Sequence, residues 1–240
     1  LSGEPYAPGS PWIAGPGSAS IDDLSVGEHY VLAFSCSRDG QGLDCHGRTD
    51  DEIGFWQLLV INVTDDEEQV VVSSLTYTDI GTSVGGSFSP SGSGAVMRSA
   101  GRDIWDVSDG FGFAHAPFSG DASLVARVDS LSDIHEWTKA GVMFRGSLSA
   151  GAAHVSLFAT PGGTVSLQHR LSDGAAMPWG TIDVDTGSLT VYLRLDRSGD
   201  VFTAYYGETG ASWVEIGSRT VSLSTDMYAG LALTSHVQGS

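Results

Sequence analysis

The chain has 240 residues, of which 41% are hydrophobic, so it can fill the core of one large domain or two ordinary ones. Acidic residues outnumber basic ones by 29 to 11, for a formal net charge of -18, and Lys139 is the only lysine. Nucleic acids and anionic membranes are bound by clustered Lys and Arg, so this balance argues against both as partners. No apolar run reaches the ~20 residues that span a bilayer, so we expect no membrane insertion.

The first segment, residues 1–20, is rich in Pro, Gly and Ser and is typical of a loop or linker. The chain begins with Leu1, and no basic region followed by an apolar stretch is present. We therefore expect an excised or processed part of a longer protein.

Cys36 and Cys45 are the only cysteines, and they flank the glycine-rich loop in "CSRDGQGLDC". A hairpin here would place them opposite each other, which suits a disulfide in an oxidising, extracellular compartment. Free thiols, or a metal site completed by a histidine or an aspartate, remain as alternatives.

Helical periodicity is nearly absent, and short strand-like runs separated by turn signals recur about every 8 to 15 residues. This pattern predicts an all-β fold of antiparallel strands, either a two-sheet sandwich or a barrel. The runs are "EHYVLAFS", "FWQLLVINV", "QVVVSSLTY", "SLVARVDSL", "AGVMFRG", "AHVSLFAT", "TVSLQHRL", "LTVYLRLDR", "VFTAYYG" and "MYAGLALTS".

The acidic run "DDEEQ" follows a strong strand and indicates a boundary near residue 68, which divides the chain into residues 1–68 and 69–240. Carboxylates gather at both ends of that strand, "IGFWQLLVINV". They could share calcium at a domain joint, or they could form a solvated linker. The candidate ligands are Asp50, Asp51, Glu52, Asp65, Asp66 and Glu67.

A third acidic group lies in "GRDIWDVSDGF", where Asp103, Asp106 and Asp109 are spaced by three residues around Trp105. Carboxylates on a flexible loop suit calcium. Aspartate also favours turns because it bonds its own backbone, so the stretch could be a structural corner instead.

The segment "ASIDDLSVGEHYVLAFSCSRDGQGLDCHGRTDDEIGFWQLLVINVTDD" is similar to the final strands of bacterial immunoglobulin-like domains of the PKD or cadherin-like kind. Such domains need about seven strands, and residues 1–27 are too few to supply the missing ones. Either the chain starts inside that domain, or this partial segment packs onto the second one.

A second resemblance covers about 160 residues, including "GSGAVMRSAGRDIWDVSDGFGFAHAPFSGDASLVARVDSL", "EWTKAGVMFRGSLSAGAAHVSLFATPGG", "RLDRSGDVFTAYYGETGASWVEIGS" and "YAGLALTSH". They resemble a bacterial concanavalin A-like sandwich family annotated after a regulator of enolase. The resemblance implies a secreted, two-sheet jelly roll, often appended to polysaccharide-degrading enzymes or surface proteins. It also implies that "DIW" starts a core strand and that Asp106 and Asp109 fall in a turn, which favours the structural corner over calcium.

The sequence offers little for catalysis. Glycosidases need paired carboxylates, and related catalytic sandwiches place them in an E-x-D-x-x-E pattern, which is absent. "GTSVG" at 81–85 matches a nucleophile motif, but no helix is expected after it. The histidines show no H-E-x-x-H spacing. We expect no enzyme.

Alternation within four predicted strands places polar side chains opposite the apolar ones. Guanidinium groups beside aromatic rings suit sugar hydroxyls, and exposed tryptophans could stack on a glycan. Ordinary cross-strand pairs with Asp or Glu are the alternative. The glycan-binding candidates are Arg127, Arg145, Gln168, Arg170, Tyr192, Arg194, Trp137 and Trp179.

We therefore expect a non-catalytic extracellular or cell-surface module that binds a polysaccharide or surface glycan, or that serves adhesion. The first rival is a structural subunit of a surface filament or layer, in which copies of the chain or neighbouring modules complete each other by strand exchange. A polysaccharide hydrolase is the third reading.

Overall fold

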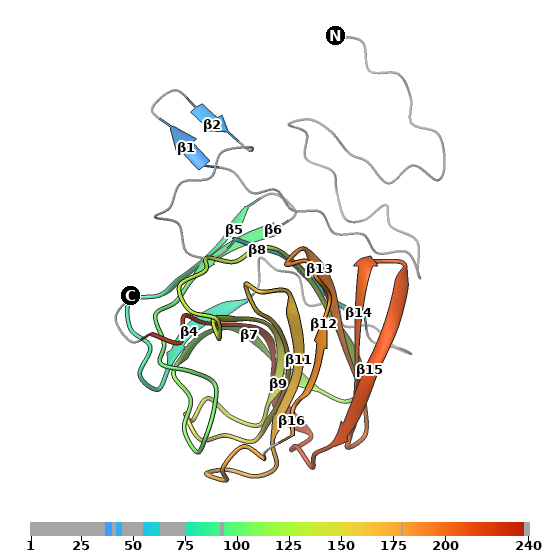
Figure 1. The fold of residues 1–240 in the computed structure, drawn as a ribbon. Coiled ribbons are helices and arrows are strands. Elements are labelled where there is room, and N and C mark those ends of the chain that lie inside the picture. The colour runs from blue at the N-terminus through green and yellow to red at the C-terminus, as the bar shows by residue number, and fades with distance from the viewer. Residues whose placement is uncertain are drawn as a thin grey trace. The chain divides into compact units, whose positions relative to one another are not determined.

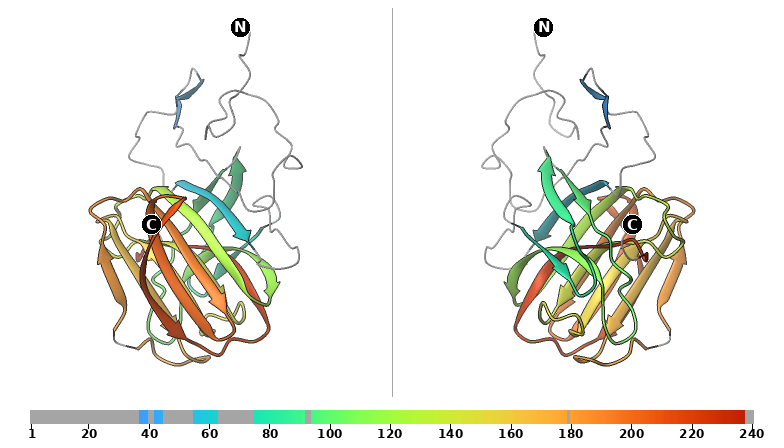
Figure 2. Two further views of the ribbon diagram at one scale, coloured as in Figure 1. Left: turned by 90° about the vertical axis from the view of Figure 1, so that its right-hand side faces the viewer. Right: turned by 90° about the vertical axis from the view of Figure 1, so that its left-hand side faces the viewer.

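The computed structural model describes residues 37–39, 42–44, 55–62, 75–91, 94–178 and 180–237. None of these residues forms a helix, and most of them lie in antiparallel strands, so the all-β prediction is confirmed. No helix in this part of the chain is long and apolar enough to cross a membrane. The strands form two seven-stranded sheets in a sandwich, and a separate two-stranded hairpin (Figures 1 and 2).

The first sheet is built mainly from the middle of the chain, and the last strand, β16, is inserted within it between β7 and β9. Its strands, in spatial order, are β12 (Ile182–Asp185), β11 (Thr164–Arg170), β10 (His154–Ala159), β9 (Lys139–Arg145), β16 (Asp226–Thr234), β7 (Phe111–Ser119) and β4 (Thr76–Ile80).

The second sheet contains the hairpins of the C-terminal half and several earlier strands. At one edge β5 carries Pro90, a residue that edge strands tolerate because it cannot donate to a neighbour. In spatial order the strands are β15 (Ser212–Thr220), β14 (Val201–Thr209), β13 (Val191–Ser198), β8 (Ala122–Ser130), β3 (Phe55–Asn62), β6 (Gly94–Arg98) and β5 (Ser87–Ser91).

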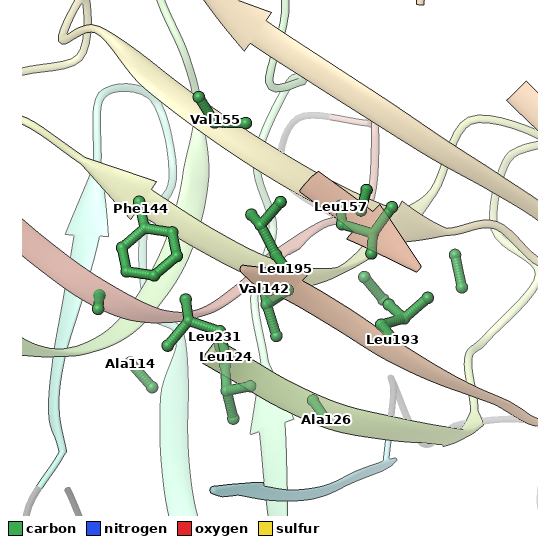
Figure 3. Close-up of a cluster of buried hydrophobic side chains, with 14 of the residues drawn as sticks. Ala114, Leu124, Ala126, Val142, Phe144, Val155, Leu157, Leu193, Leu195 and Leu231 are labelled. Carbon is green, nitrogen blue, oxygen red and sulfur yellow. The ribbon is translucent and has the colours of Figure 1, made fainter. Parts of the chain in front are cut away.

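The main core lies between the two sheets. Alternate apolar residues of β8 and β13 face those of β9 and β10, and Figure 3 shows these side chains meeting between the strands. Burial of each such side chain contributes about 1.5–3 kcal/mol. The central members are Leu124, Ala126, Val142, Phe144, Val155, Leu157, Leu193, Leu195 and Leu231.

The two sheets differ in what covers their outer faces. In the second sheet β8 and β13 alternate between buried and partly exposed residues. In the first sheet every residue of β9 and β10 is buried, because a second apolar cluster covers the outer face. That cluster combines strand residues with Ile104, which comes from the loop at residues 101–110. The first sheet is therefore packed on both faces, whereas no segment of the described ranges covers the outer face of the second, which we call its open face.

Two parts of the N-terminal segment are described. The hairpin of β1 (Ser37–Asp39) and β2 (Gly42–Asp44) is antiparallel and pairs Ser37 with Asp44. The predicted disulfide partners, Cys36 and Cys45, lie just outside these strands and outside the described residues, so the disulfide stays a prediction.

The strand expected in "FWQLLVINV" is β3, and it pairs with β6 and β8 of the second sheet. Residues 55–62 are therefore part of the sandwich, and the two alternatives for the rest of the N-terminal segment stay predictions. Residues 63–74 lie outside the described part, so the boundary near residue 68 and the immunoglobulin-like character of residues 1–68 also stay predictions. The calcium candidates at 50–52 and 65–67 lie outside it as well.

Candidate functional site

The four predicted arginines lie on two different sheets. Arg127 on β8 and Arg194 on β13 belong to the second sheet, while Arg145 on β9 and Arg170 on β11 belong to the first. On β8, β9 and β13 the arginine alternates with core residues, as predicted. Alternation leaves open whether the four share a sheet, and the structure divides them in pairs between the two opposite outer faces of the sandwich.

Arg145 and Arg170 are both fully buried, and they share one carboxylate, that of Asp109. Arg145 Nη1 lies 2.6 Å from Asp109 Oδ2, and Arg170 donates to both oxygens at 2.8 and 2.6 Å. Backbone carbonyls accept further bonds from both guanidinium groups, among them those of Ala150 and Ala152. Burial lowers the pKa of Arg145 and Asp109 opposes that shift. Neither arginine is available to a ligand.

The loop at residues 101–110 thus fills the outer face of the first sheet. It carries no strand: Asp103 forms one isolated bridge with Gly110. The implied core strand at "DIW" is therefore wrong, and Ile104 is the residue of that segment that is buried completely. Asp106 lies in a turn with a φ of 53°, as the resemblance implied.

The three aspartates of this loop do not converge on a common point. Asp103 accepts a bond from Lys139 Nζ at 2.8 Å, and its other oxygen lies 3.1 Å from His236 Nδ1. Lys139 also lies over the ring of Trp105, 5.3 Å from its centre. With Asp109 held by two arginines, the ion pairs explain the loop as a structural corner. Within the described residues no group of three or more potential metal ligands occurs.

Gln168 also faces this covered region and is 2% exposed. Its Nε2 donates to Ser166 Oγ at 3.0 Å, and Ser166 in turn donates to Asp183. The neighbouring His154 is fully buried, and burial, with the nearby charges of Arg145 and Arg170, holds its pKa well below the usual value. Beside the second apolar cluster, the outer face of the first sheet thus holds buried, hydrogen-bonded polar side chains, and it is not a groove.

Ser83 of "GTSVG" belongs to another internal network. It is 3% exposed, its Oγ donates to Asp79 at 2.9 Å, and it lies 3.0 Å from Ser99 Oγ. Tyr77 donates to the same aspartate at 2.7 Å. These contacts account for the serine as a structural residue.

The open face of the second sheet brings three of the predicted residues together. Arg127, Tyr192 and Arg194 lie on adjacent strands β8 and β13, where Tyr192 is directly paired with Arg127. Tyr205 on β14 and Trp213 on β15 join them. We call these five residues the aromatic–arginine face.

Cation–π contacts connect the members of this face. The Arg194 guanidinium lies 5.3 Å from the Tyr205 ring centre and 5.7 Å from that of Trp213. Arg127 lies 5.4 Å from the ring centre of Tyr192, whose ring meets Trp213 edge-on at 6.5 Å. Such contacts hold long side chains in one conformation at a partly exposed surface.

Carboxylates balance the charge of the face. Arg194 Nε and Nη2 each lie 2.7 Å from an oxygen of Asp196, and Arg127 Nε lies 2.9 Å from Asp129. The hydrogen bond to Asp196 raises the pKa of Arg194. Burial raises the pKa of Asp129 from 3.8 to about 6, against the attraction of Arg127. Both arginines remain accessible, with 26% and 34% of their side chains exposed.

Sequence reasoning missed Tyr205 and Trp213, although a signal for Tyr205 was present. The turn in "DRSGD" joins β13 to β14, and Gly199 takes the left-handed φ of 59° that such turns require. Pairing the chain across this turn places Tyr205 opposite Arg194. Trp213 is harder to predict, because irregular pairing shifts the register between β14 and β15.

The remaining candidates are the two tryptophans. Trp179 lies outside the described residues. Trp137 is 41% exposed and lines a shallow cleft of about 300 Å³ between the loop before β9 and the β10–β11 turn. It does not belong to the aromatic–arginine face.

Comparison with known proteins yields the fold alone. No protein-family model matches the chain, and no curated protein matches it. A crystal structure of a functionally unknown protein from Saccharomyces cerevisiae is similar, with a TM-score of 0.54 at 13% identity over 70% of this chain and 90% of that one. The chain therefore shares an antiparallel β-sandwich with a solved protein to which no function is attached.

Proposed function

We propose that the chain is a non-catalytic extracellular module that binds a neutral glycan chain on its aromatic–arginine face. The observation that carries the proposal is Arg194. It is partly exposed, held by both oxygens of Asp196, and flanked by the rings of Tyr205 and Trp213. A sugar-binding site needs a polar group that is fixed in place beside an apolar ring. The Arg194 guanidinium is that polar group, and Tyr205 and Trp213 supply the rings.

The arrangement suits the two kinds of surface on a pyranose. Its hydroxyls can bond to guanidinium donors and carboxylate acceptors that are already oriented by each other. Its C–H faces can contact the rings of Tyr192, Tyr205 and Trp213, which offer a large apolar area at little cost in side-chain entropy. Because the cation–π contacts already fix the conformation, little ordering remains to oppose binding.

The charge pattern favours a neutral chain. Asp196 and Asp129 pair with the two arginines, and Glu215 lies opposite Tyr205 on β15. The protein as a whole carries a net charge of -18, which repels acidic polysaccharides. The open outer face also has room for several sugar units, since β8, β13, β14 and β15 are neighbours in one sheet.

The test is isothermal titration calorimetry with cello-, laminari- and mannohexaose. We expect at least one of these neutral chains to bind, and Trp213→Ala and Arg194→Ala each to weaken that binding at least ~10-fold, since Trp and Arg are typical binding hot spots. Arg219→Ala is the matched control. Arg219 lies on the same strand as Trp213, but its guanidinium donates to Gly180 O, so the affinity should not change.

Equal losses in Arg219→Ala and Arg194→Ala would contradict the proposal, because they would point to a general effect on the strand. So would affinities in Trp213→Ala and Arg194→Ala that match the unsubstituted chain. Binding of an acidic hexasaccharide in place of the neutral ones would refute the choice of ligand.

A further inference from the structure

The cleft beside Trp137 lies on two loops that take no part in the aromatic–arginine face. One wall comes from residues 131–138, which precede β9, and the other from the turn between β10 and β11. Its volume of about 300 Å³ is at the lower end of the range for small-molecule sites, which is the scale of a single sugar unit. Its lining residues are Asp133, Glu136, Trp137, Thr160, Pro161, Gly162 and Thr164.

The charge of the cleft is negative, and no cation of the lining balances it. Asp133 and Glu136 are both exposed, and in the described part of the chain no ion pair involves either of them. In the aromatic–arginine face, by contrast, the carboxylates of Asp129 and Asp196 each pair with an arginine. The cleft therefore attracts a positive group that the protein itself does not provide.

The indole of Trp137 independently favours a positively charged ligand in the cleft. It is 41% exposed, and aromatic faces of tryptophan attract ammonium groups as well as the C–H face of a sugar. Opposite it, Gly162 leaves open space, since a side chain at that position would meet nothing within 4 Å. A ring can thus enter the cleft against the indole.

The backbone that carries Trp137 is held in place without help from a ligand. Its amide donates to His135 Nδ1 at 3.1 Å, and the His135 ring stacks on that of His236 at 4.2 Å. Thr138 donates its hydroxyl to Ser235 O at 3.1 Å. The loop is fixed to the segment after β16 while the Trp137 indole is partly exposed, so little ordering of the loop opposes binding.

We propose that this cleft binds a protonated amino sugar, with the pyranose ring on the Trp137 face and the ammonium group between Asp133 and Glu136. A neutral or N-acetylated sugar would leave both carboxylates without a cation. A simple metal ion would leave the indole without a role. An amino sugar uses both, and Thr164 in the lining of the cleft offers a hydroxyl to the ring.

Calorimetry at about pH 6, where amines and carboxylates are both charged, tests the assignment. The probes are the fully deacetylated chitin tetrasaccharide and its N-acetylated counterpart. We expect the deacetylated chain to bind at least ~10-fold more tightly, and Trp137→Ala, Glu136→Gln and Asp133→Asn each to weaken that binding ~3- to 10-fold.

Glu208→Gln is the matched control for Glu136→Gln. Both substitutions change the net charge equally, but Glu208 is an exposed residue of β14 outside the cleft, so this variant should bind the amino sugar as the unsubstituted chain does. Repeating the titrations in Trp213→Ala, in which the aromatic–arginine face is impaired, assigns to the cleft only the binding that persists.

Three results would overturn the assignment. Equal losses in Glu136→Gln and Glu208→Gln would mean that only the diffuse negative charge attracts the probe. Equal affinities for the two tetrasaccharides would exclude recognition of the ammonium group. Binding of a lysine-containing peptide, with no binding of the deacetylated chain, would assign the cleft to a protein partner.

Discussion

Both sheets carry arginines on their outer faces, at positions that alternate with core residues. The two sheets differ in whether other residues cover these arginines. On the first sheet, residues 101–110 cover Arg145 and Arg170 and supply Asp109 as their common partner. On the second sheet nothing described covers Arg194, which pairs with Asp196 on its own strand. The alternation within a strand therefore predicts which face of the sheet a residue lies on. Whether that face is exposed to solvent depends on a loop that is distant in the sequence.

The largest expected effect comes from one substitution made on both sheets. Arg170→Ala leaves Asp109 short of a partner in a buried site, and we expect a loss of about 3–5 kcal/mol in the free energy of unfolding. Arg194→Ala breaks a partly exposed pair, and the loss should stay below about 1 kcal/mol. Urea denaturation of both variants measures the difference. Equal losses would show that the two faces do not differ in coverage.

A second prediction tests the loop itself. Ile104 is fully buried against the first sheet, so Ile104→Ala should cost about 2–4 kcal/mol. Val107 in the same loop is 46% exposed, and Val107→Ala should change stability by less than about 0.5 kcal/mol. If Ile104→Ala were as mild as Val107→Ala, the loop would not be packed on the sheet in solution.

The smallest effect concerns pH on the open face. Burial raises the pKa of Asp129 in the folded protein, so the folded state holds this proton more tightly than the unfolded chain. Stability from this group is then present at low pH and is lost as the pH rises from 3.8 through about 6.

Because the asparagine side chain does not ionise, Asp129→Asn removes this pH-dependent loss of stability. At pH 7 its Tm should exceed that of the unsubstituted chain by about 2–4 °C, the shift that ~1 kcal/mol produces in a domain of this size, and the gain should vanish near pH 4. Glu208→Gln, at an exposed position, should show no such dependence in scanning calorimetry. A gain in Tm that is equal at both pH values would contradict the pKa shift.

Much of the fold follows from local patterns in the chain. Alternation identified the core side of β8, β9 and β13, because a strand sends successive residues to opposite faces. The turn at Gly199 fixes the register that puts Tyr205 beside Arg194. Local signals of this kind predict contacts within one strand or between the two strands of one hairpin.

The remaining features depend on contacts between distant parts of the chain. Asp109 and Arg170 are 61 residues apart, and no pattern near either one predicts their pairing. For the same reason the acidic spacing of "GRDIWDVSDGF" left a calcium site and a structural corner both open, and it does not predict that Asp103 pairs with Lys139 and Asp109 with the two buried arginines. The order of strands within each sheet is equally non-local, and it separates the four predicted arginines.

The central claim is that the open face of the second sheet is the surface that binds a glycan. The most direct measurement is an NMR titration of the labelled protein with whichever neutral hexasaccharide binds best in calorimetry. The account predicts that the indole N–H of Trp213 and the amides of Tyr192, Arg194 and Tyr205 shift with the ligand, while those of Arg145 and Arg170 do not. Shifts confined to the first sheet or to the loops at its ends, with no change at Trp213, would contradict it.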